Sequence, residues 1–352
     1  MMPTSAIQDL HELYDYLDAA IQLEHATLPP YLVALYSVHP GTNPDAVQIL
    51  RVVAVEEMLH LTIAANVLNA VGGKPDLNAP GFVPAYPTHL PSGETDFEVG
   101  TGAFTPAALE TFLKIERPGM SGRGARQLIA KARNRSGSFL GRHPRDSGWS
   151  YYSIGDFYNA IRDGLRTLEE EARKSGGTIF TGEPSRQVTS EYYYSGGGKL
   201  RAVTDLDSAL AALELVIEQG EGEDHGIWSG DGELSHYYRF QQLQLGRYYE
   251  PGDMEPGRPT GAEIKIDWDA VYPVKPNIKL SDFPPKSELL GVAKAFNDAY
   301  RRFLDLLTQS YNGRPELLLE AVPFMFSFRN MVNELIRNPL PGGGNAAPTF
   351  EV

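Results

Sequence analysis

Two short strings, Glu57-Met-Leu-His60 and Glu233-Leu-Ser-His236, constrain what this chain can fold into more than any other feature. Each places a carboxylate and an imidazole three residues apart, so on a helix both side chains lie on one face. Two such pairs, with one further glutamate from each of two other helices, hold two metal ions in the core of a four-helix bundle. Because this spacing also arises by chance, its weight depends on the surrounding sequence.

The first two predicted helices place their acids on the apolar side. A helix predicted to begin at Ser5 repeats apolar residues at three- and four-residue steps, and Glu24 lies on that stripe. Pro29-Pro30 is expected to kink or interrupt this helix, which can then resume. A second helix, opened by Asn43-Pro44, carries the Glu57/His60 pair in line with its aliphatic residues. Since a buried unpaired charge is costly, these positions predict ligands rather than plain core.

The Glu233/His236 pair also has a candidate partner acid on another predicted helix. A third bundle helix is predicted to begin at Thr204 or Asp205 and to run past Glu218, and a fourth begins near Glu233. A tight antiparallel connection between them would bring Glu218 and Glu233 to the same level. Three neighbours stay open as substitutes for Glu218: Glu214, Glu221 and His225.

These positions predict a site for two metal ions with six ligands. Glu57 and Glu233 would bridge the ions, His60 and His236 would cap them, and Glu24 and Glu218 would be terminal ligands. Glu56 also reaches the same face, but it is interpreted as a solvated or supporting acid. In the competing interpretation both histidines are ordinary core residues and the acids lie on the surface.

Composition limits which metals and which binding partners this chain can have. The 352 residues contain no cysteine, so any metal is held by oxygen and nitrogen, which suits two iron ions; manganese or a single metal stays open. A net charge of −14 without a basic stripe excludes nucleic acid as a partner. No apolar run is long enough to cross a membrane, and the first residues do not resemble a signal peptide. A cytoplasmic location is therefore expected.

The chain is expected to be mainly α. Residues 1–250 are predicted to form a four-helix bundle interrupted by a loop-rich insertion at about 74–200, in which Thr105-Pro106 and Ser153 start helices. Residues 251–352 add an extended stretch and two packing helices, which are expected to pad the bundle or to bury an interface in a homo-oligomer. The arginines of Gly119–Ser147 could close over an anionic substrate or form a solvated surface.

Several strings in the chain resemble a known family. The strings EHATLPPYLVALYS at 24–37 and VEEMLHL at 55–61 are similar to the ferritin-like domain of the iminophenyl-pyruvate dimer synthase group. Further likeness is found at 216–222, 233–240 and 271–277. The resemblance implies a ferritin-like bundle, the metal ligands named above and oxidation of an amino-acid-derived substrate in secondary metabolism. The synthases of that group are much longer chains.

Two functions follow as hypotheses. The first is a non-haem di-iron oxidoreductase that activates O₂ and oxidises a small molecule, with electrons from a separate reductase because no flavin or nicotinamide motif appears. The second is a metal-binding or storage-like protein without an organic substrate. The long insertion and the aromatic loops favour the first, because a substrate pocket needs such elements.

Overall fold

The computed structural model describes residues 6–119, 149–193, 198–222, 226–255 and 257–352. Within these ranges the chain is mainly helical and forms only isolated β-bridges, so the predicted fold class is confirmed. The eight α-helices of these ranges are α1 (Leu10–Ser37), α2 (Pro44–Ala70), α3 (Pro106–Ile115), α5 (Ile154–Lys174), α6 (Leu206–Glu221), α7 (His236–Leu245), α8 (Glu288–Tyr311) and α9 (Leu318–Ile336).

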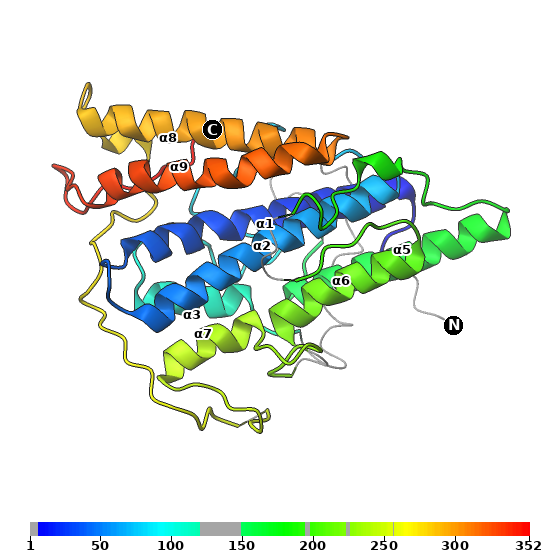
Figure 1. Ribbon diagram of the computed structural model, residues 1–352, viewed down its shortest axis with the longest axis horizontal. Helices are drawn as coiled ribbons and strands as arrows, with labels where there is room; N and C mark the ends of the chain where they lie inside the picture. The colour runs from blue at the N-terminus through cyan, green and yellow to red at the C-terminus, as the bar shows by residue number, and fades with distance from the viewer. Residues whose placement is uncertain (1–5, 120–148, 194–197, 223–225, 256) are drawn as a thin grey trace.

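The long helices α1 and α2 lie side by side through the middle of the molecule (Figure 1). The α5/α6 pair lies along one side of them, the α8/α9 pair covers the other, and the short helices α3 and α7 pack against each other (Figure 1). Most of the middle of α1 and the C-terminal half of α2 is buried around the whole helix, as expected for elements enclosed by others. None of the described helices is long and apolar enough to span a membrane.

The helix α1 continues through Pro29 and Pro30, where the sequence predicts a kink or an interruption. A proline lacks the N–H that normally bonds the carbonyl four residues earlier. The carbonyl of Ala26, left without its partner by Pro30, instead accepts a hydrogen bond of 2.8 Å from the hydroxyl of Tyr86. A side chain from the insertion thus satisfies the backbone of the first helix.

Two predicted helix starts are corrected by the structure. Ser5 lies outside the described residues, and α1 is capped by Asp9, whose carboxylate accepts a hydrogen bond of 2.9 Å from the N–H of Glu12. The fourth predicted helix, α7, begins at His236 rather than near Glu233. Glu233 stands in the turn before it, where its carbonyl accepts from the N–H of Ser229 at 2.7 Å. The predicted starts at Asp205 and Ser153 are confirmed.

The region expected to be an insertion contributes helices that pack on the bundle itself. The amphipathic helix α5 is capped by Ser153 and packs against both α1 and α6. The helix α3 is capped by Thr105 and packs against α7. Residues 74–200 therefore supply part of the wall around the centre of the molecule as well as loops. The arginine-rich stretch after Gly119 lies outside the described residues.

Candidate metal centre

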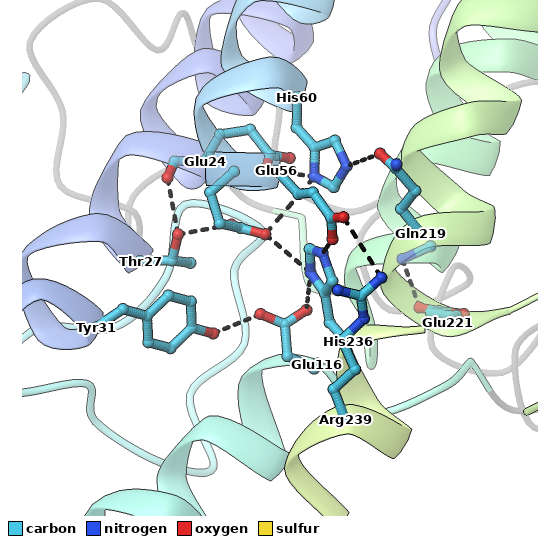
Figure 2. A network of polar contacts seen from close by, with 12 residues as sticks. Glu24, Thr27, Tyr31, Glu56, His60, Glu116, Gln219, Glu221, His236 and Arg239 are labelled. Carbon is cyan, nitrogen blue, oxygen red and sulfur yellow. Dashed lines mark hydrogen bonds and ion pairs between the residues drawn. The ribbon is translucent and has the colours of Figure 1, made fainter. Parts of the chain in front are cut away.

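Five titratable residues converge between α1, α2, α3 and α7, and Figure 2 shows the network around them. We call them the cluster: Glu24, Glu57, His60, Glu116 and His236. All five side chains are enclosed, and none of the residues is more than 3% exposed. Groups of this kind are rarely buried unless they are paired or bind a ligand.

Glu57 stands at the middle of the cluster. Its Oε1 lies 3.1 Å from Nδ1 of His236 and 3.6 Å from Nδ1 of His60. Its Oε2 accepts a hydrogen bond of 2.7 Å from the hydroxyl of Thr27. Ligand atoms of Glu57, His60 and His236 lie within 4.8 Å of one another, so these three side chains could hold a metal ion.

The other two carboxylates flank this centre, one beside each imidazole. Glu24 Oε2 lies 3.5 Å from Nδ1 of His60, and Glu116 Oε2 lies 3.4 Å from Nδ1 of His236. Each imidazole therefore points the same ring nitrogen at Glu57 and at one outer acid. The cluster has two similar halves that share Glu57.

The far nitrogen of each imidazole is held from outside the cluster. Nε2 of His60 lies 2.9 Å from Oε1 of Gln219, and Nε2 of His236 lies 2.8 Å from Oε2 of Glu56. Arg239 in turn approaches the other oxygen of Glu56 at 3.4 Å. Partners of this kind fix the ring orientation of metal-binding histidines. Glu56, expected to be solvated or supporting, is buried and supports His236.

Each outer acid also accepts a hydrogen bond from a buried tyrosine. The hydroxyl of Tyr158, from α5, donates to Oε1 of Glu24 at 2.5 Å. The hydroxyl of Tyr31, from α1, donates to Oε1 of Glu116. One oxygen of each outer carboxylate is thereby fixed, and the other faces an imidazole.

Burial and mutual charge shift the pKa of every member of the cluster. Burial and the charge of Glu57 raise the pKa of Glu24 to about 7, and the same two causes raise that of Glu116. Burial opposes ionisation of Glu57, but hydrogen bonds and charge from both imidazoles outweigh it and lower its pKa. Burial also opposes protonation of His60, yet the adjacent carboxylates raise its pKa to about 10. Without a metal, protons thus take the place of cations between these groups.

The metal-free protein is expected to lose stability as the pH rises from about 5.5 to about 8.5. Glu24 titrates near 4.5 when unfolded and about 7 when folded, so the folded state holds an additional proton between those values. The contribution of His60 is complete below 6.5 and is lost as the pH rises toward about 10. Urea unfolding should show a decrease of roughly 4 kcal/mol across this range. Glu24→Gln should reduce the decrease in stability that wild type shows below neutral pH. An increase in wild-type stability over this pH range would contradict the raised pKa values of Glu24 and His60.

Four of the six predicted site residues meet in the cluster, and two do not. The structure brings together Glu24, Glu57, His60 and His236, and their burial is incompatible with the interpretation of surface acids. Glu233, in contrast, has a side chain that is 65% exposed and pairs with Arg239 at 2.9 Å. The position expected for Glu233 is corrected because α7 starts only at His236, so the two residues do not share a helix face.

Glu218 also lies away from the cluster. Its Oε2 accepts a hydrogen bond of 3.2 Å from the N–H of Gly230 in the connection between α6 and α7. Of its substitutes, Glu214 pairs with Arg162 on the partly exposed side of α6, and His225 lies outside the described residues. Glu221 is buried beside the cluster, as described below.

Glu116 is the cluster residue that the sequence analysis missed. It follows directly on α3 and continues a buried stripe formed by Leu109, Phe112 and Leu113. This periodicity of three and four residues is the same signal that identifies Glu24 on the first helix. The helix α3 has only 10 residues, so its stripe is much shorter than that of the first helix.

A small cavity of about 10 Å³, with room for about one water molecule, lies against the cluster. The five cluster residues form one side of it. The rest of its wall comes from the start of α5 and the end of α6: Ile154, Gly155, Val216, Ile217, Gly220 and Glu221. Glu221 fastens these two helices together, because its carboxylate accepts the N–H groups of Gly155 at 2.6 Å and Gly119 at 2.8 Å.

The comparison with known families agrees with the fold. A family model described as Ferritin-like matches residues 17–245, which include all five cluster residues. The chain therefore belongs to the ferritin-like family. A ferritin like protein from Caulobacter vibrioides, known from its crystal structure, has the same fold with a TM-score of 0.60 at 21% identity, covering 98% of this chain and 99% of that one.

The chain is also a distant homologue of a synthase. It is 28% identical over 327 residues to dichlorochromopyrrolate synthase of Lentzea aerocolonigenes. The match covers 85% of this chain but 29% of that protein. The chain thus spans less than a third of the length of this relative.

Proposed function

We propose that the cluster binds two metal ions, with iron favoured, and that the protein uses O₂ to oxidise a small, amino-acid-derived molecule. The observation that carries the proposal is the buried set of three carboxylates and two imidazoles, arranged in two halves around Glu57. In a ferritin-like bundle such a donor set suits two adjacent cations. Carboxylate and imidazole ligands together favour iron or manganese over softer ions.

The donor atoms fit this assignment. Nδ1 of His236 is buried and has no well-aligned hydrogen bond to any described residue, although Glu57 lies 3.1 Å away. One ion would take Glu24 and His60, the other Glu116 and His236, with Glu57 between them. The bound ions would supply the means to reduce O₂ and to accept electrons from the substrate.

The surrounding residues orient the ligands, and the protons on the outer acids make metal binding depend on pH. Gln219 and Glu56 direct the two imidazoles, while Tyr158 and Tyr31 each hold one oxygen of an outer carboxylate. Because metal binding displaces protons, the raised pKa values of Glu24 and Glu116 make loading depend on pH. The near-complete burial of the cluster keeps bulk water away from these groups.

The relationship to a synthase supports an enzyme of secondary metabolism over a storage protein. The decisive experiment is O₂ uptake by protein loaded anaerobically with Fe²⁺, with and without a chemical reductant. We expect about two irons per chain, and uptake that increases when an aromatic amino acid or its 2-oxo or imino derivative is added. Absence of bound metal would overturn the proposal. Repeated uptake driven by Fe²⁺ alone, with accumulation of ferric iron and no effect of any organic compound, would favour the storage alternative.

A further inference from the structure

The two imidazoles of the cluster differ in the group that accepts a hydrogen bond from their far nitrogen. Nε2 of His60 lies 2.9 Å from the amide oxygen of Gln219, on α6. Nε2 of His236 lies 2.8 Å from a carboxylate oxygen of Glu56, on α2. Both nitrogens act as donors, because amide and carboxylate oxygens accept. One imidazole therefore donates to a neutral amide and the other to an acid (Figure 2).

The carboxylate of Glu56 is held in place by Arg239, from α7. Glu56 is 2% exposed, and its second oxygen lies 3.4 Å from a guanidinium nitrogen of Arg239. Arg239 is itself held by Glu233 at 2.9 Å and by the carbonyl of Leu234, to which its Nε donates. A guanidinium at this position favours the charged form of the acid. Because a buried acid–arginine pair contributes little to stability by itself, its place behind His236 indicates a role at the cluster.

This difference affects a metal ion bound at Nδ1. In both histidines Nδ1 is the ring nitrogen that faces Glu57 and one outer acid, so it is the nitrogen available to a metal. A carboxylate that accepts the other N–H makes an imidazole a more basic and stronger ligand than a neutral amide does. Such outer partners change metal affinity by about 10–100-fold. The two halves have similar ligands but unequal support.

We infer that the half of the cluster containing His236 binds its metal ion first and more tightly than the half containing His60, and that Glu56 causes the difference. The inference rests on the proposed function, because it takes the cluster to be the metal centre. Glu56 and Arg239 are positioning residues that act through His236, and Gln219 is the weaker counterpart on the other side. When metal is scarce, the protein would hold one ion, beside His236.

The test is a titration of the metal-free protein with Co²⁺ in competition with a chelator. Proton NMR follows the ring N–H groups of the bound histidines, because cobalt shifts their signals away from all others. We expect two equivalents whose affinities differ by about tenfold or more, with one shifted N–H signal appearing before the other.

Two variants identify the halves. Glu56→Gln should weaken the first equivalent by about tenfold or more and change the position of the signal that appears first. Gln219→Glu gives His60 the kind of partner that His236 has, so it should strengthen the second equivalent and change the position of the second signal. Poor folding cannot produce this strengthening, so the test stands even if Glu56→Gln fails to fold.

Glu169→Gln is the matched control. Glu169 is a carboxylate on α5 that is 2% exposed, pairs with Arg173 at 2.8 Å and accepts the N–H of Ile179. It has the same burial and the same kind of partner as Glu56, in another helix, and its variant should bind both equivalents as wild type does.

Two equal equivalents in wild type would overturn the inference and leave the metal centre intact. A first signal that responds to Gln219→Glu would also overturn it, as would an unchanged second equivalent in that variant. Equal weakening in Glu169→Gln would show that the loss in Glu56→Gln is not specific, and would overturn it too. Absence of cobalt binding in wild type would instead overturn the proposed metal centre, and this inference with it.

Discussion

Glu57→Gln is expected to retain at most about a tenth of the wild-type metal, with affinity lowered by about 100-fold or more, because even an outer partner of a metal ligand is worth about 10–100-fold. Oε1 of Glu57 faces both imidazoles, and the two halves of the cluster share it. Glutamine keeps the shape of the side chain but removes the charge that two cations would share. Metal analysis after dialysis measures the effect, and circular dichroism confirms that the variant is folded.

The matched control is Glu233→Gln, which makes the same chemical change at the acid of the second Glu-x-x-His string. The side chain of Glu233 is 65% exposed and pairs with Arg239, so this variant should bind as much metal as wild type. The two variants distinguish the arrangement in the structure from the one expected from spacing alone. A loss of metal in Glu233→Gln equal to that in Glu57→Gln would contradict the structure.

Glu116→Gln is expected to lose about one of the two metal ions. Glu116 faces only His236, whereas the other half of the cluster keeps Glu24 and His60. The remaining ion should be held by that half together with Glu57. Titration of the metal-free protein with Co²⁺ should show one equivalent bound tightly and the second weakened by about tenfold or more.

Glu110→Gln is the control for this variant, because Glu110 lies on the exposed side of the same helix and pairs with Lys114. It should bind both equivalents as wild type does. Two tight equivalents in Glu116→Gln would show that Glu116 is not a ligand. Loss of both would show that the halves do not bind metal separately.

The sequence predicts the central helices and the three cluster residues on them well because local signals coincide there. Capping residues, a proline at the first turn and an apolar stripe all agree around Glu57 and His60, and the same stripe identifies Glu24. These residues lie inside long helices, where periodicity indicates the buried side directly. Family resemblance and periodicity therefore point to the same positions.

The remaining features of the cluster and of the fold depend on contacts between residues that are far apart in the sequence. Spacing places Glu233 and His236 on one helix face, but only the start of α7 at His236 decides that they do not share it. Glu116 comes from a short helix whose place depends on packing against α7, about 120 residues later in the chain. Tyr86, which satisfies the carbonyl of Ala26 below the two prolines, is likewise distant in sequence.

The position of the cluster also has a mechanical consequence. Its five residues extend along the chain from residue 24 to residue 236, yet they meet at one point between helices that are otherwise joined by side-chain packing. Ions bound there would tie α1, α2, α3 and α7 together as a cross-link does, because the unfolded chain offers no such arrangement. Iron supply would then determine how much of this protein persists in its folded form, in addition to whether it is active.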